Sequence, residues 1–233
     1  MPPTSLNPLN LVAEQEAGIV SKIRILCLHG YHGSANILRQ QMNPLSESVR
    51  SIVEFTVVDA PTIASGDFGW WHGTFPSSNG QFRNWELTRS WTNDLFRNQG
   101  PFDGVFGFSQ GAALTGLLTG LRASDEKVSD ETPIAFDFAI MVGGFLSAEP
   151  EHQKLYAATD RYRIPSIHVI GTSDYVVPST ESRELAARFE APEIIEHPGG
   201  HVIPALPVVQ EKVTAFVTDM ADRATAATRS RSV

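Results

Sequence analysis

The chain has 233 residues, of which 42% are hydrophobic and 19% are charged, and its formal net charge is −8 at pH 7. These values are typical of one globular domain with a substantial core. The negative charge argues against nucleic acid as a partner, because phosphates are neutralised by basic surfaces. No apolar run approaches the roughly 18 residues that a membrane span needs.

Strand-like and helix-like segments alternate along the chain, which predicts an α/β fold with a mostly parallel central sheet and helices on both faces. The expected strands are 22–28, 52–58, 102–107, 136–142, 166–170 and 193–196. The expected helices are 35–49, 85–98, 110–122, 151–158, 179–190 and 205–221. Pro44 is expected to end or kink the first of these helices.

The chain ends and one internal stretch lack this pattern. We expect a single domain over 22–221, a loosely ordered segment over 1–21 and a disordered tail over 222–233. Residues 61–84 are rich in glycine and tryptophan and form a long irregular stretch, which favours a lid-like or binding insert. The start of the chain has no secretory pattern, and Cys27 is the only cysteine. Both features favour a reducing compartment, most simply the cytoplasm, with Cys27 as a core residue.

The most informative motif is Gly107-Phe108-Ser109-Gln110-Gly111, which lies between a buried-strand pattern and a helix pattern. G-x-S-x-G at a strand-to-helix turn is the nucleophile elbow of the α/β-hydrolases, so Ser109 is the expected nucleophile. Glycine is expected on both sides because a Cβ would collide with the neighbouring strand and helix.

A serine hydroxyl needs a base, and α/β-hydrolases supply it in the chain order Ser, Asp or Glu, His. Asp174 follows the strand 166–170, at the sheet edge where parallel α/β sheets bind ligands, and His201 follows the last strand and a glycine pair. The alternatives are Asp137 or Asp160 as the acid and His197 as the base; all three are less well placed.

The oxyanion that forms during acyl transfer needs hydrogen-bond donors. We expect the backbone N–H of Gln110, at a helix start, and that of Tyr31, in the loop after the first strand. His29 is expected to order this loop. No metal site is expected, because neither His29 and His32 nor His197 and His201 have a zinc-like pattern with a nearby carboxylate.

Apolar residues near the expected strand ends are candidates for the wall of a substrate pocket. They are Trp70, Trp71, Phe145, Val176 and Val177. The two tryptophans have an alternative interpretation, in which they pack the insert onto the core.

The chain resembles the family of serine hydrolases (FSH) that includes the ovarian-cancer-associated hydrolase, a compact branch of the α/β-hydrolase superfamily. The matching segments, in collinear order from about residue 22 to 220, are 26–30, 69–71, 100–114, 165–179 and 199–204. The resemblance implies the α/β-hydrolase fold, a Ser109–Asp174–His201 triad and hydrolysis of carboxylic esters or thioesters. Several fungal members resemble thioesterases that release polyketides from their synthases. His32 departs from the family pattern, in which an amide side chain is common.

The sequence thus predicts a serine hydrolase that cleaves acyl thioesters or carboxylic esters without a cofactor, with an acyl-carrier protein of a synthase as a candidate partner. A broad small-ester carboxylesterase is the alternative enzyme. A catalytically silent module that binds acyl groups or carrier proteins is the alternative of another class.

Overall fold

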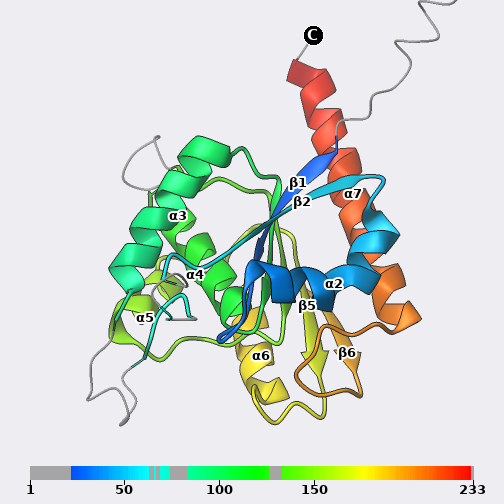
Figure 1. The fold of residues 1–233 in the computed structure, drawn as a ribbon. Coiled ribbons are helices and arrows are strands. Elements are labelled where there is room, and N and C mark those ends of the chain that lie inside the picture. Colours follow the sequence, from blue (N-terminus) through cyan, green and yellow to red (C-terminus); the bar gives the residue numbers. More distant parts are fainter. Residues whose placement is uncertain (1–21, 63–65, 67–68, 74–82, 126–132, 232–233) are drawn as a thin grey trace, which may run out of the picture.

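The computed structural model describes residues 22–62, 66, 69–73, 83–125 and 133–231. The expected N-terminal segment 1–21 lies outside the described residues, as do 63–65, 67–68 and 74–82 of the expected insert. Figure 1 shows a central sheet with helices on both of its faces.

The described strands form one six-stranded sheet in the order β2-β1-β3-β4-β5-β6, and each neighbouring pair is parallel. The strands are β1 (Ile23–Leu28), β2 (Val53–Val58), β3 (Gly104–Phe108), β4 (Phe138–Val142), β5 (Ser166–Gly171) and β6 (Glu193–His197). This confirms the predicted sheet. The chain moves outward from β1 to β2 and then returns to place β3 on the other side of β1. The carboxyl ends of β1 and β3 therefore flank a topological switch point, the usual ligand site of such sheets.

Each face of the sheet has its own core and its own helices. One core includes residues of α3 (Trp85–Gln99), α4 (Gln110–Asp125), α5 (Pro150–Tyr156) and α6 (Ser179–Ala186). The opposite core includes residues of α2 (Ala35–Val49) and α7 (Pro207–Arg231). In Figure 1, α2 and α7 accordingly lie across the sheet from α3, α4 and α5. Because helices cover both faces of the sheet, its central strands are buried on both sides, which explains why their sequences are continuous apolar runs.

Strand β1 shows how one strand serves both cores. Leu26 and Leu28 point into the α4 side, whereas Ile25 and Cys27 point into the α2 and α7 side, as the two-residue period of a strand requires. Cys27 has no exposed surface, and burial raises the pKa of its thiol. It is therefore an inert core residue, as the sequence predicts.

Two helix ends, those of α6 and α7, lie more than three residues from their expected positions, whereas α2 spans the expected 35–49 and does not end at Pro44. Helix α2 continues through Pro44 to Val49. Pro44 has no N–H to donate to the carbonyl of Gln40, four residues earlier. The helix tolerates this loss because Gln40 is exposed, so water can reach that carbonyl. Helix α6 ends at Ala186, because the following turn leads to Phe189, which is fully buried.

Helix α7 continues to Arg231, through residues expected to belong to a disordered tail. The segment from 222 to 231 is rich in alanine and arginine, which are good helix formers. Arg223 also pairs with Asp219 one turn earlier, and Ala224 packs against the core on the α2 side. Helix propensity and packing together explain why these residues are helical.

Candidate active site

Ser109 lies at a sharp turn between β3 and α4, with a positive φ of 56°. Such a backbone is strained for a residue with a side chain, and strain of this kind is common at active sites. A Cβ on Gly107 would come within 2.3 Å of the Gly111 oxygen, and one on Gly111 would come within 2.1 Å of the Leu28 oxygen. Both glycines of the motif are therefore required, for the steric reason that the sequence suggests.

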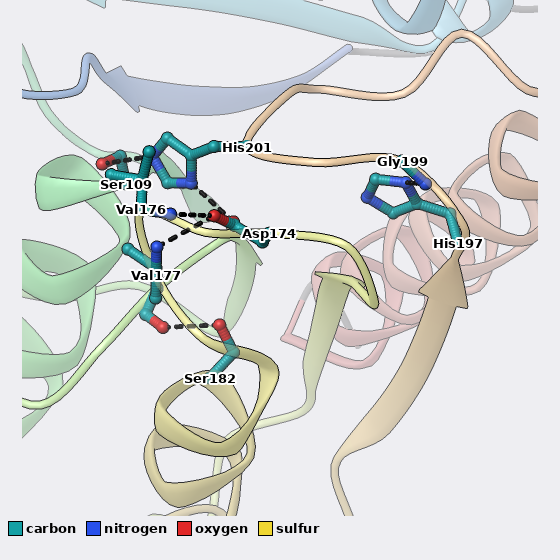
Figure 2. A network of polar contacts seen from close by, with 9 residues as sticks. Ser109, Asp174, Val176, Val177, Ser182, His197, Gly199 and His201 are labelled. Atoms are coloured by element: carbon teal, nitrogen blue, oxygen red, sulfur yellow. Dashed lines mark hydrogen bonds and ion pairs between the residues drawn. The ribbon is translucent and has the colours of Figure 1, made fainter.

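The structure brings Ser109, His201 and Asp174 together, although they belong to loops after three different strands (Figure 2). His201 Nε2 lies 2.8 Å from Ser109 Oγ, and His201 Nδ1 lies 2.6 Å from Asp174 Oδ2. The Asp174 side chain is 2% exposed and that of His201 is 16% exposed. A nearly buried carboxylate thus faces the imidazole, which in turn faces the hydroxyl.

The Asp174 carboxylate divides its two oxygens between two tasks. Oδ2 contacts His201, while Oδ1 accepts hydrogen bonds from the N–H groups of Val176 and Val177 at 2.8 and 2.9 Å. These bonds close a tight turn in which Val177 is buried, whereas Tyr175 is 94% exposed and Val176 is 70% exposed. The same carboxylate therefore orients the imidazole and fixes the turn that carries Val176 and Val177.

The loop that carries His201 is tied to the loop after β5. Thr172 and Ser173 donate backbone hydrogen bonds to the carbonyls of His197 and Gly199, at 2.8 and 3.2 Å. The imidazole of His201 also packs on the ring of Phe108, with ring centroids 5.0 Å apart. The position of His201 is therefore fixed by backbone contacts on one side and by an aromatic ring on the other.

The alternative acid and base residues do not reach Ser109. His197 is buried, and its Nδ1 accepts a hydrogen bond from the Gly199 N–H at 3.1 Å. Burial lowers the pKa of His197, although the charge of Asp174 opposes this change. Asp137 is exposed and precedes β4, so it lies at the opposite edge of the sheet. Asp160 is exposed beyond the end of α5.

The loop after β1 forms a turn that Gly33 closes by donating a hydrogen bond to the Gly30 carbonyl at 2.9 Å. Tyr31 and His32 occupy its centre, and His32 has a φ of 57°, a conformation that histidine adopts more readily than most residues. The N–H of Tyr31 is not used to close this turn. The N–H of Gln110, at the first position of α4, is one of the four amides that lack a partner within a helix, and it lies at the positive end of the helix dipole.

His29 orders this loop through both ring nitrogens. Nε2 accepts a hydrogen bond from the Ala60 N–H at 3.1 Å, which leaves the ring proton on Nδ1 to be donated to the Gly30 carbonyl at 2.8 Å. Burial lowers the pKa of His29, and the hydrogen bond to Gly30 and the charge of Asp59 oppose this change. A neutral imidazole in one tautomer thus fixes the start of the turn.

The residues expected to line a pocket lie in different environments. Trp70 has no exposed surface and packs on the His29 and Trp91 rings, so it anchors the insert to the core rather than lining an open pocket. Trp71 is buried against Trp85 and His152. Figure 2 shows Val176 and Val177 beside the triad.

Phe145, the remaining candidate for the pocket wall, is partly buried and packs against the core on the α4 side. Sequence reasoning missed the contributions of the Phe108 ring and of the Gln110 side chain. Their neighbours in sequence carry the motif, but nothing in the motif indicates where these two side chains point.

The described residues lack two other features, a metal site and a membrane-spanning helix. Within these ranges, no three histidine, cysteine or acidic side chains are grouped in a way that could hold a metal ion. None of the described helices combines the length and apolar character that crossing a membrane requires.

Comparison with known proteins places the chain in a family. The family model described as "Serine hydrolase (FSH1)" matches residues 19–213. "Esterase OVCA2" of Danio rerio is 35% identical, over 78% of this chain and 91% of its own length. "Esterase CG5412" of Drosophila melanogaster is 33% identical, over 88% of this chain and 76% of its own length.

A solved structure, the acyl-protein thioesterase 2 of Zea mays, is similar in fold, with a TM-score of 0.60 and 19% identity over 86% of this chain and 94% of that one. It supports the α/β-hydrolase fold that the sheet topology indicates. The family match covers most of the chain, including β1 to β6 and all three loops around Ser109. The chain therefore belongs to the FSH1 family of serine hydrolases.

Proposed function

We propose that this serine hydrolase cleaves acyl thioesters or carboxylic esters through a Ser109–His201–Asp174 triad. The observation that carries the proposal is the position of the His201 imidazole, whose two nitrogens lie 2.8 Å from Ser109 Oγ and 2.6 Å from Asp174 Oδ2. A hydroxyl, an imidazole and a buried carboxylate in this order are the parts of a nucleophilic serine site.

The proposed reaction has two steps. His201 Nε2 takes the Ser109 proton while Oγ attacks the acyl carbonyl carbon, and His201 then gives this proton to the leaving thiolate or alkoxide. Water, activated by His201, attacks the resulting acyl-enzyme and releases the carboxylic acid and free Ser109. Asp174 keeps the imidazole in the required tautomer and stabilises its charged form. Every proton transfer in these steps runs between Ser109, His201, the leaving group and water.

The oxyanion of each tetrahedral intermediate needs donors aimed at it, and removing one such donor costs about 100- to 1,000-fold in kcat. We assign this role to the backbone N–H groups of Tyr31 and Gln110. The turn that Gly33 closes supports the first assignment, and the position of Gln110 at the start of α4 supports the second. Both residues come from the strand ends that flank the switch point.

The apolar rim of the site supports an acyl group as the part of the substrate that the protein recognises. Tyr175 and Val176 are exposed beside Asp174, and Val202, which follows His201, is 51% exposed. The resemblance to thioesterases that release polyketides makes a thioester on an acyl-carrier protein the first substrate to test, in a reducing compartment such as the cytoplasm. The family relatives named as esterases support simple esters as the second.

The test is reaction of the purified protein with a fluorophosphonate, followed by hydrolysis of matched acyl-thioester and acyl-oxyester series. We expect labelling of the wild type, none of Ser109→Ala, and loss of hydrolysis in that variant. Faster turnover of the thioesters supports carrier-linked substrates, and faster turnover of short oxyesters supports a broad carboxylesterase. A wild-type protein that neither reacts with the probe nor hydrolyses any member would instead be a silent binding module.

A further inference from the structure

The side chain of Gln110 joins the nucleophile elbow to the insert. Its Oε1 accepts a hydrogen bond from the Trp70 N–H at 3.0 Å, and its Nε2 donates one to the Trp71 carbonyl at 2.7 Å. Gln110 is only 6% exposed, so both bonds are shielded from water. A primary amide can form this pair because it both accepts and donates, whereas an ionised carboxylate only accepts.

The same stretch of the insert contacts Tyr31, the second residue assigned to the oxyanion hole. A Cβ on Gly69 would come within 2.7 Å of the Tyr31 ring and 3.2 Å of Gln110 Oε1, so both side chains meet at this glycine. The Tyr31 hydroxyl also lies 3.2 Å from His72 Nδ1. Residues 69–72 therefore contact the two assigned donor residues from one side.

This stretch is itself firmly held, so it can act as a fixed reference. Trp70 Nε1 donates to the His29 carbonyl at 2.8 Å, and the Trp70 carbonyl accepts a hydrogen bond from Thr88 of α3. His72 and Arg83 exchange two backbone hydrogen bonds at 3.0 Å. The insert thus connects the loop after β1 with α3 and α4.

We propose that Gln110 is a positioning residue, whose side-chain amide uses residues 69–72 to hold the N–H groups of Tyr31 and Gln110 at the spacing that the oxyanion needs. The inference rests on the proposed function and goes beyond it, because it assigns a role to a side chain that does not touch the substrate. A displacement of about 1 Å at such a site can cost up to 100-fold in rate.

The first test is kinetic. Gln110→Met keeps the size of the side chain and the backbone N–H but removes both hydrogen bonds. We expect kcat to fall about 10- to 100-fold with KM changed less than about 3-fold, because the oxyanion forms only in the transition state. Tyr31→Phe, which removes only the contact with His72, should lower kcat a few-fold. Gln153→Met is the matched control, since the Gln153 amide also donates to a backbone carbonyl, but to that of Ser147 rather than to one of residues 69–72.

The second test uses pH and separates positioning from a general loss of structure. In Gln110→Glu, the protonated carboxyl can accept from Trp70 and donate to Trp71, but the ionised form cannot donate. The ratio of variant to wild-type kcat should therefore fall as the pH rises from 5 to 9, while the ratio for Gln110→Met stays constant.

The two levels of the proposal fail in different ways. The positioning role is wrong if Gln110→Met keeps the wild-type kcat while the wild type reacts with a fluorophosphonate. A cooperative thermal unfolding transition shows that this variant is folded, and the triad stands in this case. A kcat for Gln110→Glu that stays at the wild-type value up to pH 9, where the ionised carboxylate cannot donate, also contradicts the positioning role. If Ser109→Ala keeps full activity, the proposed function itself is wrong.

Discussion

Gly143, directly after β4, lies against the imidazole of His201: a Cβ on this glycine would come within 3.1 Å of Cε1 and 3.2 Å of Nδ1. The residue also has a φ of 56°, which favours glycine. None of the side chains of the loop after β4 belongs to the triad. The loop nevertheless contributes to the site, because the Gly143 backbone lies against the ring and restricts the movement of the imidazole on that side.

We predict that Gly143→Ala lowers kcat by at least about 10-fold, because the new methyl group pushes the imidazole from its place between Ser109 and Asp174. Steady-state kinetics with an acyl ester measures the effect. Gly116→Ala in α4 is the control, since its Cβ would meet the end of the flexible Leu185 side chain at 2.9 Å and make an ordinary contact with the Tyr156 ring at 3.7 Å. Wild-type kcat in Gly143→Ala would show that the imidazole has room to move.

The two tasks of Asp174 can be separated by two substitutions. Asp174→Asn keeps an oxygen that can accept from Val176 and Val177 but loses the charge toward His201, so we expect kcat to fall about 1,000- to 10,000-fold with little change in Tm. Asp174→Ala should match this loss of activity and also lower Tm, because the two N–H groups lose their acceptor. Thermal unfolding and kinetics on both variants test this, and equal Tm values would contradict the structural task.

Gly111→Ala should be far more damaging than an ordinary glycine substitution in a helix. Its methyl group would meet the Leu28 carbonyl at 2.1 Å, so β1 and α4 must separate. We expect a lower Tm and at least about 100-fold lower activity, because the loop after β1 carries the Tyr31 N–H. The usual gain from replacing a helical glycine by alanine, about 1 kcal/mol, does not compensate. A variant with raised Tm would refute the close contact.

Stability should decline in acid because of buried histidines. Burial lowers the pKa of His152 to about 4 and that of His168 to about 3, against an ordinary value of 6.5. Above pH 6.5 both are neutral, folded or unfolded. As the pH falls further, the unfolded chain binds protons that the folded one cannot. The free energy of unfolding should then fall by about 1.4 kcal/mol per pH unit for each histidine, down to about pH 4 for His152 and pH 3 for His168.

Urea unfolding at pH 7.5, 6.5, 5.5 and 4.5 measures this slope. His168→Gln should make the slope shallower by the contribution of one proton, although it lowers stability at every pH because the ring packs on Phe189. An unchanged slope in His168→Gln would show that this histidine takes up its proton in the folded state.

The sequence predicts the sheet and the meeting of Ser109, Asp174 and His201 because these features have local signals. Apolar runs mark the strands, and the carboxyl ends of parallel strands meet at one edge, so residues after β3, β5 and β6 must be neighbours. The glycines of the elbow follow from the steric demand of the turn. The end of α7 was not predictable in this way, because Ala224 is held by packing against residues distant in the chain.

The place of Trp70 shows the other limit of sequence reasoning. Its N–H binds the side chain of Gln110, 40 positions away, and its indole binds the carbonyl of His29, 41 positions away. No periodic pattern reports such contacts, so packing on the core and lining a pocket were equally compatible with the sequence. Only the fold shows that this tryptophan anchors the insert.

The burial of Cys27 gives the protein an internal reporter. Cys27 is the second-to-last residue of β1, which lies between β2 and β3, and it is the only cysteine in the chain. Its side chain lies in the core beneath α2 and α7, so an alkylating reagent can reach this sulfur only after that packing opens, and the rate of modification measures how often it does. A single chemical readout thus follows the packing of the strand on which the turn at Tyr31 is built, without any engineered label.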